Sequence, residues 1–190
     1  MSVIALLQDW YKFNCNGDWE HQYGVKINTV ANPGWSVLID LADTALEDFT
    51  YFFESVKSDD DWVHIKTENN VFIAGGDPTK LEIIAASFLY DFLRPKLKES
   101  TFTYEMYAPI VSLNIWRPVN ARMIDVGEFQ IVEIPKSEWR TLKAFHLDDF
   151  QKVDKEMCLK GEIEYQVGDV VRGELVTFYD YPSLVIVDKR

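Results

Sequence analysis

The stretch VKINTVANPGWSVLIDL, residues 25–41, decides how the first half of the chain folds. Apolar and polar side chains alternate on both sides of Asn32–Gly34. Alternation with a period of two places the apolar residues on one face of a strand. Pro followed by Gly is typical of a turn in which Gly takes a positive φ. We therefore expect a hairpin of two strands, Val25–Thr29 and Trp35–Leu41.

Three further strands are expected after this hairpin, at Phe49–Val56, Trp62–Thr67 and Val71–Ala74. They are rich in β-branched and aromatic residues, which favour strands. The polar segments Ser58–Asp61 and Asn69-Asn70 between them are typical of turns. Together with the hairpin, these strands predict an antiparallel sheet of about five strands.

Two helices are expected to flank the sheet. The first is capped by Ser2, carries an apolar stripe and stops at Asn14–Gly17. The second is expected to begin with Asp77 as its cap and Pro78 at its first position. It is expected to end at Arg94-Pro95, because the residue before a proline disfavours the helical conformation. The segment between Asp18 and Gly24 is expected to be a loop.

The texture of the sequence changes after the polar stretch Lys96–Thr101. One weak helical patch, Leu147–Met157, interrupts a series of short alternating runs. We therefore expect an α+β chain with a sheet-and-helix domain at 1–97 and a mainly β domain of unknown role at 98–190. The alternating runs are Phe102–Met106, Ile110–Ile115, Phe129–Ile134, Gly161–Val167, Gly173–Tyr179 and Leu184–Val187.

The chain is acidic, with a formal net charge of −12 over 190 residues. Residues 1–97 hold 15 acidic and 7 basic side chains and are the more acidic half. Nucleic acids and anionic membranes select basic surfaces, so neither is expected as a partner. The charge favours a basic protein partner, although solubility alone is the simpler explanation.

The cysteines and the N-terminus bear on where the protein acts. Cys15 and Cys158 are the only cysteines, which is too few for a disulfide framework. The first residues lack the basic and apolar regions of a signal peptide, and no apolar run reaches the length of a membrane span. We therefore expect a cytoplasmic protein.

One polar cluster, Asp18–His21 with Cys15 before it, raises the question of catalysis. A metal is not expected there, because His64 and His146 lie far away in the sequence. A Cys15/His21 pair could serve a small hydrolase or transferase. However, Cys15 follows the end of a predicted helix and has acidic neighbours, and both disfavour a thiolate.

Two other motifs have a structural and a functional interpretation. Gly75–Pro78 precedes a predicted helix but lacks the lysine and glycine spacing of a phosphate loop, so a bend with a helix cap is expected. Asp59–Asp61 forms an acidic turn, which is solvated in most proteins but could also steer a basic partner.

A series of ordered phrases runs through the N-terminal half: LQDWY (7–11), CNGDWEH (15–21), YGVKI (23–27), NPGWSV (32–37), IDL (39–41), DW (61–62), ENN (68–70) and GGDP (75–78), followed by the second predicted helix. With these phrases, about residues 5–95 resemble immunity-protein family fifty-three of the bacterial polymorphic-toxin systems. This resemblance implies a small α+β domain that neutralises a co-encoded toxin stoichiometrically, in the cytoplasm, without a cofactor. No resemblance is found for residues 100–190.

The sequence leads to one preferred function and two alternatives. The preferred function is a non-catalytic inhibitor that occludes a cognate toxin, for which Trp19, Trp35 and Trp62 are anchors if they are exposed. Trp35 is equally compatible with the core. The alternatives are an enzyme that uses Cys15 and His21, and a C-terminal barrel with its own ligand or partner. The candidate toxin-binding residues are Asp18, Trp19, Glu20, His21, Trp35, Asp59, Asp60, Asp61 and Trp62.

Overall fold

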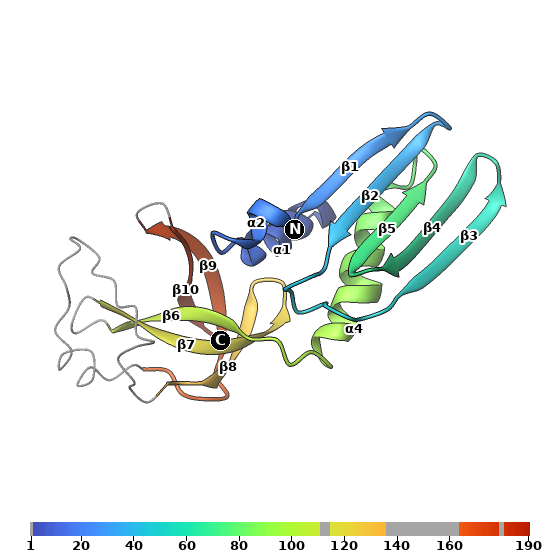
Figure 1. The fold of residues 1–190 in the computed structure, drawn as a ribbon. Coiled ribbons are helices and arrows are strands. Elements are labelled where there is room, and N and C mark those ends of the chain that lie inside the picture. Colours follow the sequence, from blue (N-terminus) through green and yellow to red (C-terminus); the bar gives the residue numbers. More distant parts are fainter. Residues whose placement is uncertain (1, 111–114, 136–163, 179–180) are drawn as a thin grey trace. The chain divides into compact units, whose positions relative to one another are not determined.

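The fold is described from a computed structural model, which describes residues 2–110, 115–135, 164–178 and 181–190 (Figure 1). The chain forms two compact units, Met1–Phe102 and Thr103–Arg190. Residues 98–100 belong with the first unit, because the backbone N–H groups of Lys98, Glu99 and Ser100 bond to the carbonyls of Pro95 and Lys96.

The first unit contains the predicted antiparallel sheet. Its strands are β1 (Val25–Val30), β2 (Gly34–Asp40), β3 (Phe52–Ser58), β4 (Asp61–Glu68) and β5 (Val71–Gly76). Their order in the sheet is β1-β2-β5-β4-β3, and every neighbouring pair is antiparallel. The α+β fold class is therefore confirmed, and β1 and β3 are the two edges of an open sheet.

The β1–β2 hairpin has the predicted position but a different reason for its glycine. Val30 pairs with Gly34, so Gly34 is the first residue of β2 and not a turn residue with a positive φ. A Cβ atom on Gly34 would lie 2.4 Å from the carbonyl oxygen of Gly76. Gly34 is needed because two backbones approach closely there, and the predicted positive φ is wrong.

The first helix is confirmed, whereas the loop expected after it is partly helical. Helix α1 (Val3–Asn14) begins at Ser2, whose Oγ accepts a hydrogen bond from the Ala5 N–H at 3.2 Å. A single helical turn, α2 (Trp19–Gln22), lies within the segment expected to be a loop. The turn was missed because four residues are too short for a helical period to be recognised in sequence.

The second helical segment begins and ends later than the sequence predicted. It consists of α3 (Leu81–Ala86), a π-helical stretch η1 (Ser87–Leu93) and α4 (Arg94–Leu97). Asp77 lies four residues before α3 and does not cap it. Pro95 lies in the first turn of α4, directly after η1, so it stands inside a continuous helical segment and has no N–H to donate to the preceding turn. Arg94 remains helical and its N–H bonds to Leu89, one residue further back than in an α-helix.

The helices lie against one face of the sheet (Figure 1). An aromatic core joins them to it. Trp10 of α1 is fully buried and packs edge-on against Phe88, with ring centroids 4.9 Å apart. Phe88 in turn contacts Phe72 of β5 at 5.1 Å, and Phe72 stacks on Phe92 at 5.8 Å. Trp19 extends the chain of rings, 6.1 Å from Trp10. Aromatic burial therefore fixes both helical segments on the sheet.

The second unit is a closed barrel. Its strands are β6 (Tyr104–Ile110), β7 (Ile115–Asp125), β8 (Glu128–Glu133), β9 (Val170–Phe178) and β10 (Tyr181–Lys189). They follow one another around the barrel, which closes where β10 pairs in parallel with β6 at Val185 and Tyr107. The predicted mainly β character is confirmed.

Three predictions for the second unit need correction or lie outside the described residues. Most of β7 was not predicted, because Arg117, Pro118 and Asn120 break its apolar alternation. Residues 164–167 are not a strand. The predicted helical patch Leu147–Met157 lies outside the described residues. The barrel interior is apolar and includes Met106, Val119, Met123, Phe129, Ile131, Val171 and Ile186.

Candidate functional site

The structure separates the predicted binding residues into two groups at opposite ends of the sheet. Asp18–His21 precede β1, whose start is fixed by the Asp40 N–H donating to the Gly24 carbonyl at 3.0 Å. Trp35 lies on β2 five residues before Asp40, which corresponds to about 16 Å at the usual rise of a strand. The tip at Asp59–Trp62 lies at the Trp35 end, because Val63 and Trp35 both pair with Gly76.

The polar groups around α2 serve mainly to hold the local backbone. Glu20 accepts hydrogen bonds from the N–H groups of Asn16 and Gly17, at 3.0 Å each. The Asn16 side chain accepts from the N–H groups of Asp18 and Trp19. Asp18 and His21 remain exposed.

Trp19 does not meet the condition for an interface anchor. Its side chain is only 3% exposed, and its Nε1 donates to the Ala42 carbonyl at 2.8 Å. The family phrase CNGDWEH (15–21) also includes Asn16 and Gly17, whose hydrogen bonds hold the turn around Trp19. This phrase therefore has a structural role. Trp19 belongs to the core.

Cys15 is placed as a structural residue. Its Sγ lies 3.4 Å from the Tyr11 carbonyl, at the C-terminal end of α1. Burial and the nearby charge of Glu20 raise the pKa of the Cys15 thiol. A raised pKa keeps the thiol protonated and makes it a weak nucleophile. In the part of the chain that the structure describes, no three His, Cys, Asp or Glu side chains gather as metal ligands.

The three carboxylates of the acidic tip differ in whether a lysine neutralises them. The Asp61 carboxylate pairs with Lys80 at 2.7 Å and with Lys57 at 3.5 Å. These two lysines lower the pKa of Asp61, with the hydrogen bond from Lys80 as the largest cause. Asp59 and Asp60 are exposed, and they carry the tip's uncompensated negative charge.

Asp77 organises the turn that leads from β5 to α3. Its carboxylate accepts hydrogen bonds from the Trp62 N–H at 2.9 Å and from the N–H and hydroxyl of Thr79 at 2.8 and 2.7 Å. The Lys80 Nζ also lies 3.2 Å from the Asp77 carboxylate and forms an ion pair with it. Burial alone would raise the pKa of Asp77, but these donors outweigh it and hold the pKa well below its ordinary value. The Gly75–Pro78 motif is therefore a structural bend.

Two half-buried tryptophans lie at this end of the sheet. The Trp35 Nε1 donates to the Pro78 carbonyl at 2.9 Å, so Trp35 fastens the bend to β2. The Trp62 ring covers the backbone of β2 and β5, and a Cβ atom on Gly34 or Gly75 would lie 3.4 or 3.5 Å from it. Both indoles keep part of their surface open.

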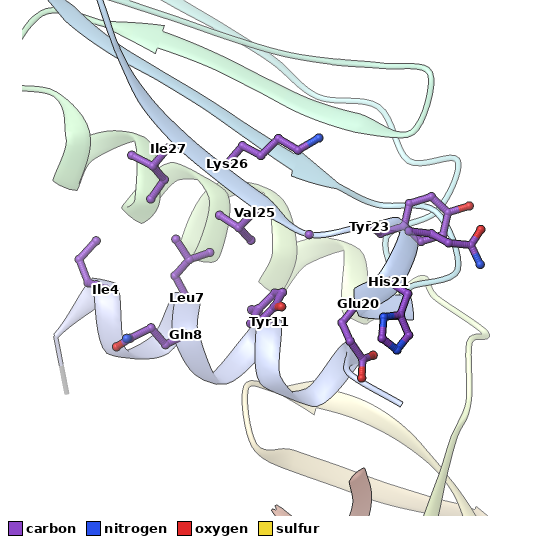
Figure 2. A pocket seen from close by; sticks show the side chains of 12 residues that line it. Ile4, Leu7, Gln8, Tyr11, Glu20, His21, Tyr23, Val25, Lys26 and Ile27 are labelled. Carbon is purple, nitrogen blue, oxygen red and sulfur yellow. The ribbon is translucent and has the colours of Figure 1, made fainter. Parts of the chain in front are cut away.

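Sequence reasoning missed a groove between α1, α2 and β1 (Figure 2). It has a volume of about 510 Å³ and an apolar floor. Ile4, Leu7 and Tyr11 line it from α1, and Val25 and Ile27 line it from β1. The available signal was the apolar alternation of β1 itself, which we assigned entirely to the core.

Sequence reasoning also missed an apolar area on the sheet face opposite the helices. Phe52 is 73% exposed and Val56 is 59% exposed, both on edge strand β3. A shallow hollow of about 290 Å³ lies beside Phe52 and is lined also by His64 and Ile73. This face is the second place where the first unit presents apolar surface.

The fold and these surfaces define a small α+β domain with an antiparallel sheet, an apolar groove and a cysteine whose thiol pKa is raised. Residues 4–91 match the model of the immunity protein 53 family. The predicted resemblance of the N-terminal half is thereby confirmed. The match ends within the first unit, and residues 103–190 lie outside it. No curated protein and no solved structure matches the chain.

Proposed function

We propose that the chain is an immunity protein that binds a cognate bacterial toxin and neutralises it by stoichiometric occlusion. The observation that carries this proposal is the match of residues 4–91 to the immunity protein 53 family. The match falls within the first unit, so toxin binding is assigned to that unit. The protein acts in the cytoplasm of the cell that makes the toxin, and it needs no cofactor.

The chemistry of the first unit supports binding over catalysis. The Cys15 thiol has a raised pKa, and the carboxylate of Glu20 is occupied by backbone donors. An enzyme that used Cys15 would need a neighbour that lowers this pKa. We therefore propose that the chain is not an enzyme.

The charge of the chain supports a basic toxin. The formal net charge is −12, and Asp59 and Asp60 present unpaired carboxylates at the exposed tip. Charges of one sign at an exposed surface steer a partner of the opposite sign. The same charge disfavours nucleic acid and anionic membranes as partners. None of the described helices is long and apolar enough to cross a membrane.

Co-expression with the toxin encoded beside the gene for this chain tests the proposal. We expect cells to survive toxin induction and an affinity-tagged chain to retain the toxin at one to one. Failure of the chain to protect cells would contradict an immunity function. Protection without any complex would contradict occlusion and favour catalysis with Cys15 and His21.

A further inference from the structure

Strand β1 has a free hydrogen-bonding edge. The Asp40 N–H donates to the Gly24 carbonyl, which makes this pair a hydrogen-bonded one. Such pairs alternate in an antiparallel ladder, so Lys26 and Asn28 bond to β2. The N–H and C=O groups of Val25, Ile27 and Thr29 therefore point away from the sheet. Among the strands that the structure describes, only β2 pairs with β1.

The apolar groove lies directly beside this edge. Ile27 is 41% exposed, and Ile4 and Tyr11 of α1 are nearly as open. Figure 2 shows the Val25 and Ile27 side chains directed toward α1, while Lys26 points to the opposite side of β1. A strand added to β1 would place every second side chain on the groove side. Backbone hydrogen bonds to β1 and burial of apolar side chains in the groove would then both stabilise the added strand.

The other edge of the sheet carries devices that oppose strand addition. Strand β3 has a bulge between Val56 and Ser58, and its exposed residues include the charged Glu54 and Lys57. Bulges and charges are the means by which proteins protect edge strands. Strand β1 has an unbroken register over six residues and a single charged residue, Lys26, whose side chain points to the side of β1 opposite α1. Strand β1 is therefore the less protected edge.

The carboxylate of Glu20 lies at the α2 end of the groove. Burial is the largest cause of the raised pKa of both Tyr11 and Cys15, and the charge of Glu20 raises both further. For Tyr11, the neighbouring Cys15 contributes more than Glu20 does. A carboxylate that raises the pKa of its neighbours sets up a negative potential at them. An occupant with a positive side chain at this end would complement that potential.

We propose that an extended segment of the toxin adds to β1 as a sixth strand of the sheet. Its alternate apolar side chains enter the groove beside Ile27, and a Lys or Arg side chain lies near Glu20. This inference rests on the proposed function and names the binding mode. It places the contact on the α1–β1 side of the sheet and leaves the Asp59–Trp62 tip for electrostatic attraction.

Amide hydrogen exchange tests the inference residue by residue, with the chain free and bound to a catalytically inactive form of the co-encoded toxin. The amides of Val25, Ile27 and Thr29 should exchange rapidly in the free chain and at least about tenfold more slowly in the complex. Those of Lys26 and Asn28 should be slow in both. The outward-facing amide of Glu54 on β3 is the internal control and should stay rapid.

Two variants of Ile27 test the same edge by affinity. Ile27→Pro removes an outward N–H without removing a bond to β2, and Glu54→Pro does the same on the other edge. We expect Ile27→Pro to weaken toxin binding at least about 100-fold and Glu54→Pro to change it less than about threefold. Ile27→Lys keeps the backbone N–H, places a positive charge in the groove and should also weaken binding. Thermal unfolding must show each variant folded.

The outcomes separate this inference from the proposed function. If the unaltered chain binds the toxin but the three outward amides stay rapid and both Ile27 variants bind at full strength, only strand addition is overturned. If the unaltered chain binds no toxin, the proposed function fails and the inference fails with it. If the outward amides are already slow in the free chain and slow further with concentration, β1 pairs with a second copy, which also overturns the inference.

Discussion

The two units of this chain differ in whether their sheets have free edges: one sheet is closed and the other is open. In the barrel of residues 103–190, every strand has a neighbour on both sides, because β10 pairs with β6. The sheet of the first unit is open, and among the described strands β1 and β3 each have a neighbour on one side only. Closure removes edges, whereas an open edge must be protected or used.

This difference bears on where binding takes place. The open unit also exposes Phe52, Val56 and Ile27, and it alone contains the segment that matches an immunity family. Among the described residues, each strand of the closed unit already has two neighbouring strands. We therefore assign toxin binding to the open unit and expect the barrel to be dispensable for it.

Separating the two units should have the largest effect. Residues 1–102 expressed alone should bind the co-encoded toxin within about tenfold of the whole chain, and residues 103–190 should bind at least about 1,000-fold more weakly. Calorimetric titration of each piece measures both affinities, after circular dichroism has shown that each is folded. Tight binding by the barrel alone would reverse the comparison.

Removing one large aromatic from each core should destabilise the units separately. Trp10 and Phe129 are both fully buried. Trp10→Ala should lower the unfolding free energy of the first unit by about 3–5 kcal/mol, and Phe129→Ala should do the same for the second. Denaturant unfolding followed by probes in each unit measures the two transitions. A shift of both transitions by one variant would show that the units unfold together.

Reversing the charge at the acidic tip should slow association. Asp59→Lys with Asp60→Lys should lower the association rate with a basic toxin about tenfold at low salt, and the effect should shrink near 1 M salt, where screening acts over about 3 Å. Stopped-flow mixing measures the rates. Glu164→Lys with Asp188→Lys makes the same charge change on the barrel and is the matched control. Equal slowing by the control would mean that net charge, and not the tip, attracts the toxin.

Acid should weaken the first unit through Asp77. The pKa of its carboxyl is lower in the folded state than the ordinary value of 3.8, so its contribution to stability is complete above that value. It is lost as the pH falls from there toward the lower folded pKa. Thermal unfolding between pH 7 and pH 2 should therefore show a steeper acid loss for the unaltered chain than for Asp77→Asn. Asp169→Asn, which removes a carboxyl with a lowered pKa in the barrel, should leave the first transition unchanged.

Cys15→Ser should have the smallest effect. Serine keeps the approximate size of the side chain and removes any thiolate chemistry. We expect full protection of toxin-producing cells and unchanged toxin affinity. Loss of protection with folding and binding intact would show that the thiol reacts, and the chain would then be an enzyme.

The sequence predicted the sheet well, because its signals are local. Alternation in residues 25–41 and the turns at Ser58–Asp61 and Asn69-Asn70 determine strands whose neighbours are mostly adjacent in sequence. The helix boundaries were less predictable. Asp77 and Pro95 suggested limits that the structure does not follow. Asp77 accepts a hydrogen bond from Trp62 of β4, 15 positions away in the sequence, and η1 continues the helix as far as Pro95.

The candidate site was predicted only in part, because exposure is a tertiary property. Trp19 and Trp62 look alike in sequence, yet one is buried by Trp10 and the other covers two glycine backbones at the surface. The pairing of Asp61 with Lys80 spans 19 positions, which no local pattern shows. The free edge of β1 follows from the strand order and not from its residues.

A titration of toxin activity against the amount of this chain tests neutralisation by binding most directly. With the toxin held well above the dissociation constant of the complex, activity should fall linearly and reach zero at one molar equivalent. The break should not move with incubation time, since an occluding inhibitor does not turn over. Complete loss of activity at a small fraction of an equivalent, or full activity in the presence of several equivalents, would contradict stoichiometric occlusion.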